Sequence, residues 1–488
     1  MKSTFKNFTG ILVFMLMLSM MLMSCSDSSD PISGIDNGNE PDPEEPELVN
    51  IPDNLLLAQI RLALDVDDNT DITPELMLEL IELNLNASED FSGEISGISD
   101  LTGLEYAENL EYLRLSYTEV TDLSPISNLE NIWYLRFNNT QITDISPLSN
   151  ITSLTYFNAN TVTGLTDISP LAGNTELRTA ILREVPFGNE GMETIRNFTT
   201  IHRINMRDTG VTDITILGEL MAEGALLDST PFAQEENGGA DLDLRGLSIE
   251  DWSPVAPYLD QINEFDGLPE NNVVNFPDSN LEDFIKAQLG VDSSEELTTI
   301  WLTGLDTLNV SGILPIADLT GIENAPNIRY LRFGETSVTD LTPIQDLEKV
   351  EYLRFNNTDV TDISPISNYT SLTYFNANTV TGLSDISPLA GNENLKEAIL
   401  RNVPFNNEGM STLRNLTSLY RINMRNTGVT DITVLGEMMA DGALLNSTPG
   451  AEEAGGATLD LRELDIEDWS PIDPYIEQIN SLDGYPAE

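Results

Sequence analysis

A long internal duplication constrains this chain more than any other feature of the sequence. The stretch TSLTYFNANTVTGL occurs at 152–165 and again at 370–383. Matching positions are 218 residues apart there and 217 apart at Trp252 and Trp469. The chain is therefore expected to contain two related domains, over 51–268 and 276–488, joined by a linker at 269–275.

A shorter period runs inside each half. The acidic markers Asp100, Asp122, Asp144 and Asp167 are spaced by 22, 22 and 23 residues, and the second half repeats this spacing. Each marker follows an apolar pattern such as Leu110-x-x-Leu113-x-Leu115. Because side chains alternate between the two faces of a strand, this pattern predicts one short strand per repeat with every second residue inward.

The segment after each strand predicts a turn and a short helix. It reads Asp-Leu/Ile-Ser-Pro-Leu/Ile, as at 122–126 and 144–148. Serine is expected to cap the helix, and proline suits its first turn, where no N–H is needed. One coil cannot bury its apolar face alone, so the coils must stack. The predicted fold is an α/β solenoid of two tandem arcs, with parallel strands on the concave face and short helices on the convex face.

These coils resemble the leucine-rich repeats of internalin-type bacterial proteins. Ile51-Pro52-Asp53 with Leu57, Ile60 and Leu64 resembles the helical N-terminal cap of that family, and Phe276-Pro277-Asp278 repeats it. The sequence departs from the family by placing threonine where the coil usually has asparagine, as at Thr118, Thr140 and Thr209. The resemblance implies the fold and a binding role, but it does not imply a particular receptor.

The first residues predict export and lipid anchoring. Lys2 and Lys6 precede an apolar run from Gly10 to Met23, which is typical of a secretory signal peptide over 1–24. Leu22-Met23-Ser24-Cys25 resembles the lipobox of bacterial lipoproteins, which implies lipidation at Cys25. The alternative is a structural cysteine beside an ordinary signal peptide, although Cys25 is the only cysteine and has no internal partner for a disulfide.

Residues 25–50 are rich in acidic residues, proline, serine and glycine, which predicts a disordered acidic tether. Asp27 and Asp30 resemble the export signal of some surface lipoproteins. We therefore expect a lipid-anchored outer-membrane protein at the cell surface, with the periplasmic leaflet as the alternative.

Charge and composition narrow the function. The formal net charge of -59 makes nucleic acid a poor partner, and a membrane is expected to be contacted through the lipid alone. His202 is the only histidine and its counterpart is Tyr420, so we expect a local packing or surface role for it. The sequence shows no Gly-rich phosphate loop and no nucleophile elbow, so we expect no cofactor and no enzyme activity. The acidic segment Asp65–Asp71 lacks the glycine and glutamate of a calcium loop; an acidic turn is expected, with loose calcium binding as the alternative.

Basic residues gather at strand positions that point away from the core. Of the 20 Lys and Arg that remain after Lys2 and Lys6, 12 occupy these positions and all are arginine. Two interpretations stand: a Tyr/Arg array that satisfies itself, or a concave binding strip, since Tyr, Trp and Arg dominate interface energetics. The candidate ligand-binding residues are Tyr112, Arg114, Tyr134, Arg136, Tyr156, Asn158, Arg183, Arg203, Arg207, Trp301, Tyr330, Arg332, Tyr352, Arg354, Tyr374, Asn376, Arg401, Arg421 and Arg425.

Two kinds of partner suit such a strip. The first is a protein or peptide ligand, bound by an adhesin or an assembly module. The alternative is an acidic or sulfated polysaccharide, for which aromatic platforms and guanidinium groups are also suitable. Salt separates the two, because binding to a polyanion weakens steeply as ionic strength rises.

Overall fold

The computed structural model describes residues 47–86, 96–312 and 315–486. The signal peptide, Cys25 and the first part of the acidic tether lie outside the described residues. Residues from Leu48 onward form one compact unit. Val49, at the end of the predicted tether, donates its backbone N–H to Ile72 O at 2.9 Å and packs against the first core.

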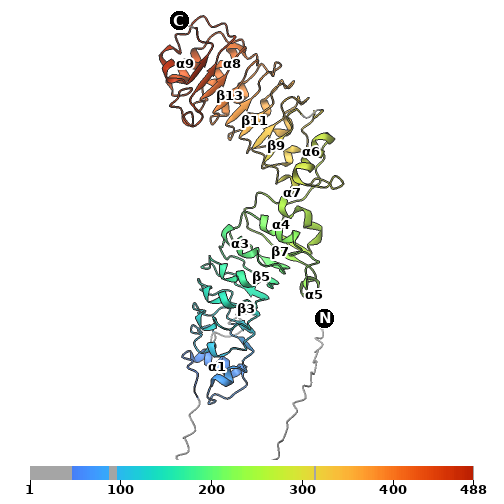
Figure 1. The fold of residues 1–488 in the computed structure, drawn as a ribbon, viewed down its shortest axis with the longest axis vertical. Coiled ribbons are helices and arrows are strands. Elements are labelled where there is room, and N and C mark those ends of the chain that lie inside the picture. Colours follow the sequence, from blue (N-terminus) through green and yellow to red (C-terminus); the bar gives the residue numbers. More distant parts are fainter. Residues whose placement is uncertain (1–46, 87–95, 313–314, 487–488) are drawn as a thin grey trace, which may run out of the picture. The chain divides into compact units, whose positions relative to one another are not determined.

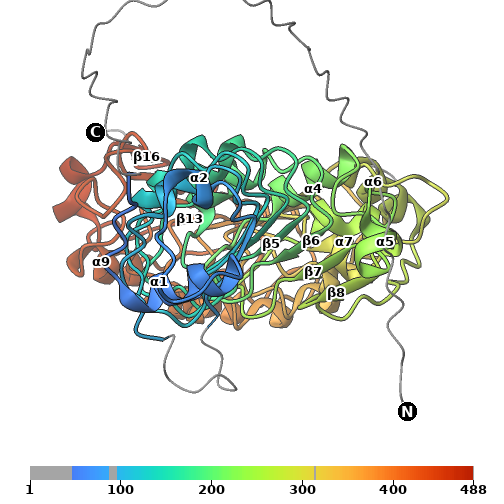
Figure 2. The same cartoon turned by 90° about the horizontal axis from the view of Figure 1, so that it is seen from below.

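The unit contains two separate sheets of eight parallel strands, each in sequential order. Figure 1 shows the strands following one another along each arc, and Figure 2 shows the run from β5 to β8. The predicted solenoid of two arcs is therefore confirmed. The first sheet comprises β1 Glu82–Asn84, β2 Tyr112–Arg114, β3 Tyr134–Arg136, β4 Tyr156–Asn158, β5 Thr179–Ile181, β6 Arg203–Asn205, β7 Asp241–Asp243 and β8 Glu264–Asp266. The second comprises β9 Thr307–Asn309, β10 Tyr330–Arg332, β11 Tyr352–Arg354, β12 Tyr374–Asn376, β13 Glu397–Ile399, β14 Arg421–Asn423, β15 Thr458–Asp460 and β16 Ser481–Asp483.

The middle residue of each strand points into the core, as the alternating pattern predicts. Leu113, Leu135 and Phe157 are fully buried on successive strands, and Leu331, Leu353 and Phe375 repeat them in the second arc. A residue with positive φ follows many of the strands, for example Tyr117 at 63°. Thr118 then donates its hydroxyl to Leu115 O at 2.7 Å, which explains how threonine serves at this position.

Helices lie in the N-terminal cap of each arc and in the segments that return from one strand to the next, as expected. In the first arc these are α1 Asn54–Ala63, α2 Pro74–Met77, η1 Leu104–Tyr106, η2 Ser124–Ile126, η3 Ser146–Asn150, η4 Ser169–Gly173, η5 Asn189–Gly191, α3 Met192–Ile195, α4 Thr215–Ala222, α5 Ala233–Asn237 and η6 Ser253–Gln261. In the second arc they are α6 Ser279–Leu289, α7 Thr299–Leu302, η7 Ile322–Asn324, η8 Thr342–Ile344, η9 Ser364–Ile366, η10 Ser387–Gly391, α8 Asn406–Leu413, α9 Thr433–Ala440 and η11 Asp473–Gln478. Those labelled η are 3₁₀ helices.

In these turns the aspartate, and not the serine, accepts the capping hydrogen bonds, so the predicted serine cap is wrong. Ser124 is the first residue of η2, and its backbone N–H and hydroxyl both donate to Asp122 Oδ1, at 2.8 and 2.6 Å. The hydroxyl and the backbone amide of Ser124 together lower the pKa of Asp122. The acidic marker of each coil is thus a turn-forming residue, because its carboxylate accepts from the backbone two residues later.

Each arc begins with the predicted helical cap. Asp53 Oδ1 accepts from the backbone N–H groups of Leu55 and Leu56, at 2.9 and 3.1 Å, and so caps α1. Its second oxygen accepts from Ser99 N at 3.0 Å, which fastens the helix to the first full coil. Asp278 Oδ1 caps α6 in the same way, and its second oxygen accepts from Ala317 N at 2.8 Å.

The end of the first arc contacts the beginning of the second. Trp252 donates its backbone N–H to Thr303 Oγ1 at 2.8 Å, and Asn327 Nδ2 donates to Glu250 O at 2.8 Å. Ile300 of α7 is fully buried and packs in the core of the first arc. The two halves therefore share a small interface although their sheets are separate.

Candidate ligand-binding site on the strand faces

The strand face of each arc is defined here by the outward side chains of its strands and of the residues just after them. The register of the sheet places the first residues of neighbouring strands side by side, so Tyr112, Tyr134 and Tyr156 form one column. Tyr330, Tyr352 and Tyr374 form the same column in the second arc.

The tyrosine rings of a column stack on one another. The Tyr134 centroid lies 4.1 Å from that of Tyr112 and 4.2 Å from that of Tyr156, with planes 16° and 6° from parallel. Tyr352 and Tyr374 stack at 4.0 Å and 3°, while Tyr330 is tilted by 34° at 6.0 Å. Neighbouring rings therefore cover both faces of Tyr134, so a ligand would meet its ring edge and not an open ring face.

Burial and the adjacent Tyr134 raise the pKa of Tyr112 to about 12. Burial also raises the pKa of Tyr156 and of Tyr352. These phenols are therefore protonated at neutral pH and keep a donor hydrogen.

The third strand positions supply two arginines at the start of each arc. An Arg114 guanidinium N–H donates to the Tyr134 hydroxyl at 3.2 Å, whereas Arg136 Nε donates to Asn138 Oδ1. The second arc repeats this arrangement: the Arg332 guanidinium lies 4.5 Å from the Tyr352 ring centroid, and Arg354 Nε donates to Asn356 Oδ1 at 2.6 Å. Within the part of the chain that the structure describes, none of these four arginines forms an ion pair with a carboxylate. Their charges are therefore not neutralised locally.

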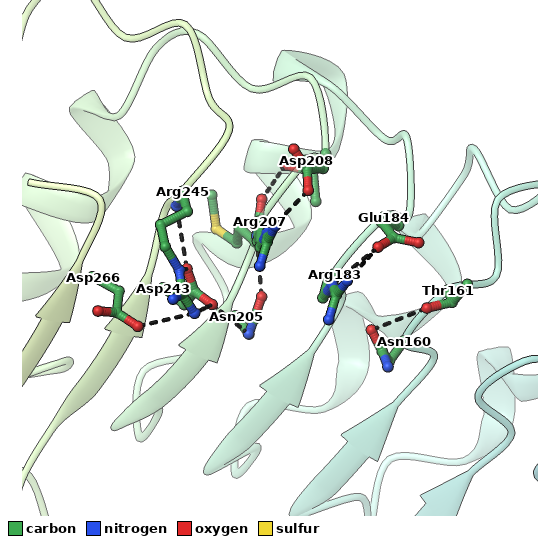
Figure 3. Close-up of polar contacts among 12 residues, drawn as sticks. Asn160, Thr161, Arg183, Glu184, Asn205, Arg207, Asp208, Asp243, Arg245 and Asp266 are labelled. Atoms are coloured by element: carbon green, nitrogen blue, oxygen red, sulfur yellow. Dashed lines mark hydrogen bonds and ion pairs between the residues drawn. The ribbon is translucent and has the colours of Figure 1, made fainter.

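Arginines farther along each arc are paired with carboxylates, as Figure 3 shows for the first arc. The ion pairs are Arg183–Glu184 at 2.7 Å, Arg207–Asp208 at 3.1 Å, and Arg245 with Asp243 and Asp266 at 2.7 and 3.0 Å. Arg203 also pairs with Asp241 at 2.9 Å. In this part of the strand face, the arginines are therefore paired with carboxylates of the chain itself.

The second arc shows the same division with one exception. Arg421 pairs with Glu397 at 3.2 Å, Arg462 with Asp460 at 2.7 Å, and Arg425 with Glu463. The Arg462 side chain, by donating to Asp460, lowers the pKa of that carboxyl group. Arg401 is exposed and forms no ion pair with a described residue, because Asn402 stands where the first arc has Glu184.

Three candidate residues are not placed to contact a ligand on the strand faces. Trp301 was expected at a strand position, but it lies on α7 and packs against the core of the second arc. Asn158 and Asn376 are buried, and their amides donate to the hydroxyls of Tyr156 and Tyr374 at 3.2 and 2.9 Å. These asparagines hold the tyrosine column in place. The other candidates lie at outward strand positions or just after the strands.

Sequence reasoning missed a group of residues in the first arc. Trp133 directly precedes β3 and is 41% exposed, with its indole N–H 3.3 Å from Glu111 Oε2. The Arg178 guanidinium lies 3.6 Å from the Phe232 ring centroid and pairs with Glu236 at 2.9 Å. These side chains precede strands or come from α5 and the residue before it, whereas the alternating pattern selects only positions within the strands. Together with the tyrosine column, Trp133, Arg178 and Glu236 line a hollow of about 620 Å³.

The residues at the corresponding positions of the second arc differ. Glu351 stands in the place of Trp133 and pairs with Arg329 at 3.2 Å. Lys396 replaces Arg178, and Gly450 replaces Phe232. The arcs therefore keep the tyrosine column and the arginines but differ along the neighbouring edge.

His202 is fully buried beside β6, and its Nε2 lies 3.3 Å from Glu236 Oε2. Burial lowers its pKa despite the attraction of Glu236. In the second arc, the Tyr420 hydroxyl donates to Glu397 Oε1 at 3.3 Å instead.

The Asp65–Asp71 segment forms an acidic turn in which Asp67 Oδ1 accepts from the Asn69 backbone N–H at 2.9 Å and from the Thr70 hydroxyl at 3.1 Å. Over the described ranges, no group of three or more His, Cys, Asp or Glu side chains is placed to hold a metal ion. None of the helices in those ranges is long and apolar enough to cross a membrane.

The architecture of one parallel strand and one short return segment per coil defines a leucine-rich-repeat solenoid. Residues 108–150 match the family model described as Leucine Rich repeats (2 copies). This match agrees with the leucine-rich-repeat architecture of the coils. No match was found among curated proteins.

Solved structures of other leucine-rich-repeat proteins are similar to this chain. An internalin (inlF) from Listeria monocytogenes is 25% identical over 79% of this chain and 93% of its own, with a TM-score of 0.36. InlJ from Listeria monocytogenes is 17% identical over 79% of this chain and 72% of its own, with a TM-score of 0.32. A plant peptide hormone receptor, RGFR1, solved in complex with RGF2, is 14% identical over 74% of this chain and 60% of its own, with a TM-score of 0.27.

Proposed function

We propose that the protein is a lipid-anchored binding module that holds a protein or peptide ligand on the strand faces of its two arcs. The observation that carries this proposal is the pair of tyrosine columns, each flanked by arginines without carboxylate partners. Tyrosine and arginine contribute most to binding when they lie at the centre of an interface. The proposed role is binding, without a catalytic step, as an adhesin or an assembly partner.

The stacking favours a peptide over a saccharide. A sugar binds aromatic side chains through an open ring face, but both faces of Tyr134 are covered by Tyr112 and Tyr156. A stacked column offers ring edges and hydroxyl groups, which suit the polar groups and side chains of a peptide. An acidic or sulfated polysaccharide remains the second candidate, supported by the same arginines.

The proposed location is the outer surface of the outer membrane, with the lipid on Cys25 as the anchor. Two or more acyl chains give durable membrane attachment without a spanning helix. Two binding arcs on one tether would also raise avidity, by about 10²–10⁴, if one ligand reaches both.

Binding is tested by capture from host and neighbouring-cell extracts, beside a glycan array, with the chain from Leu48 to Glu488. Trp133→Ala with Tyr330→Ala removes two side chains that are 41% and 43% exposed, so the fold should be retained while capture falls. The matched control changes the exposed loop residues Glu130 and Glu348 to alanine. Equal capture by both variants would contradict a role for the strand faces, and capture of glycans alone would favour the second candidate.

A further inference from the structure

We propose that the Arg114–Arg136 pair in the first arc and the Arg332–Arg354 pair in the second each bind a carboxylate of an acidic peptide segment. This inference rests on the proposed function and names the chemistry of the ligand. Its first basis is charge: the chain has 81 acidic and 22 basic residues, yet these four arginines form no ion pair within the described ranges. The arginines farther along each arc, except Arg401, do form ion pairs, so a shortage of carboxylates does not explain the difference.

The register of the sheets places the two arginines of each pair at aligned positions on neighbouring strands, Arg114 beside Arg136 and Arg332 beside Arg354. Neighbouring strands are about 4.8 Å apart, so two extended arginines at these positions could reach the same carboxylate. Guanidinium groups bind carboxylates through two parallel N–H donors, which makes arginine the best-suited cation for such a ligand.

In the structure the two side chains of each pair have different principal contacts. Arg114 donates to the Tyr134 hydroxyl, whereas Arg136 donates to Asn138, two residues after β3. Arg332 lies over the Tyr352 ring, whereas Arg354 donates to Asn356 and also contacts the Tyr352 hydroxyl. Like charges held side by side repel one another, and an anion placed between them removes that repulsion. In addition, Arg114 Nε is buried and has no hydrogen-bond partner among the described residues, so this donor is unsatisfied while the side chain keeps its present position.

The distribution of charge favours a local carboxylate over a long polyanion. A sulfated chain that followed the strand face would continue onto arginines such as Arg245, whose charge Asp243 and Asp266 already neutralise. A peptide with one or two acidic residues meets the free arginines alone. At physiological ionic strength, charges more than about 8 Å away are largely screened, so the overall negative charge does not prevent such local binding.

The two copies retain this arrangement while residues around it have changed. Trp133 corresponds to Glu351, Glu111 to Arg329 and Tyr117 to Glu335. The tyrosines, the arginine pairs and the asparagines that accept from Arg136 and Arg354 are the same in both arcs. We therefore infer that both arcs recognise the same acidic residue of a ligand. The residues that differ between the arcs, such as Trp133 and Glu351, would then select the ligand residues next to that acidic residue.

The test uses the full chain in mild detergent and a fluorescein-labelled peptide, Gly-Gly-Glu-Gly-Glu-Gly-Gly, with its glutamine counterpart as the control ligand. Fluorescence anisotropy should show about tenfold tighter binding of the glutamate peptide, which corresponds to one charge-assisted contact. In the variant Arg114→Gln, Arg136→Gln, Arg332→Gln and Arg354→Gln this preference should disappear. The matched variant Arg196→Gln, Arg245→Gln, Arg414→Gln and Arg462→Gln changes only arginines that are already paired and should keep it.

Phenylglyoxal modification with peptide mapping supplies a second readout that does not depend on variants. Arg114, Arg136, Arg332 and Arg354 should be protected by the glutamate peptide and not by the glutamine peptide. Equal binding of both peptides, or a preference that survives the first variant, would overturn the inference. Tighter binding of a sulfated oligosaccharide than of the glutamate peptide would overturn it as well. If Trp133→Ala with Tyr330→Ala abolishes capture of a ligand from extracts but the arginine variant does not, the proposed function stands and this inference fails.

Discussion

Tyr112 and Tyr134 stack on neighbouring strands, with ring centroids 4.1 Å apart and planes 16° from parallel. Burial and Tyr134 raise the pKa of Tyr112 to about 12, above its ordinary value of 10.0. Because the folded-state pKa is raised, the stabilising contribution is complete below about pH 10 and is lost as the pH rises toward about 12. Tyrosinate absorbance during an alkaline titration should therefore show a late-ionising group that is missing in Tyr112→Phe. Identical titration curves for the two proteins would contradict the stacked environment.

The aspartates that cap the first helix of each arc should be important for stability. Asp53→Ala removes an acceptor from the N-terminus of α1 and also leaves Ser99 N without its partner. A lost cap together with an unsatisfied backbone donor costs about 1–3 kcal/mol of unfolding free energy. Urea denaturation should show this loss for Asp53→Ala and for Asp278→Ala. Asparagine keeps one acceptor oxygen, so Asp53→Asn should lose less.

The same caps predict how stability changes in acid. Four backbone N–H groups lower the pKa of Asp53 although burial opposes them, and Asp278 behaves alike. Carboxyl groups with a lowered folded-state pKa stabilise the protein above their unfolded pKa of about 4, and this contribution is lost as the pH falls through the folded value. Asp53→Ala should therefore lose less stability than the parent protein between about pH 5 and about pH 3. An equal loss would show that Asp53 does not contribute to the acid transition.

His202 should make the first arc sensitive to mild acid. Burial lowers its pKa, with the positive charges of Arg178 and Arg203 acting in the same direction and Glu236 opposing them. The folded state thus binds the proton less well than the unfolded state. Stability should be complete above the unfolded pKa of about 6.5 and should decrease as the pH falls below it. Urea denaturation at about pH 7.5 and about pH 5.5 should show a smaller decrease for His202→Phe than for the parent protein. The second arc has Tyr420 at this position, so Tyr420→Phe serves as the control.

Each half of the chain should fold on its own, although less stably than in the whole protein. Each has its own helical cap and its own eight-stranded sheet. Separation at the predicted linker removes Ile300 from the core of the first arc and breaks the Trp252–Thr303 contact. Calorimetry should show one cooperative transition for 48–268 and one for 272–488. Each should occur at a lower temperature than in the full chain. A half without secondary structure by circular dichroism would show that the arcs form one folding unit.

The proposed lipid anchor is placed on Cys25, which lies outside the described residues. Cys25→Ala removes the acceptor of the lipid and should release the protein from the membrane fraction. Protease treatment of intact cells distinguishes the two possible locations. The arcs should be cleaved if they lie at the cell surface and protected if they face the periplasm. A Cys25→Ala protein that stays membrane-bound after washing would contradict the anchor.

The sequence by itself determined the architecture, the caps and the tyrosine columns. The inward positions of Leu113 and Leu135 and the outward positions of Tyr112 and Tyr134 follow from the two-residue period of a strand and the 22-residue period of the coil. Asp53 and Asp278 could likewise be placed before helices, since an N-cap is a local feature. These positions can be predicted from the sequence because each coil repeats the same local geometry.

The tertiary structure alone decided which side chains remain available to a ligand. Arg178 finds Glu236, which is 58 residues away, and Arg245 pairs with Asp266 of the next strand, whereas Arg114 meets no described carboxylate. Trp301 lies on a helix at the start of the second arc and not on a strand, because α7 precedes the first strand of that sheet. Charge pairing depends on distances between coils and loops that no sequence period encodes. The sequence therefore identified the residues of the strand faces, and only the folded chain separated the arginines that are neutralised from those that are free.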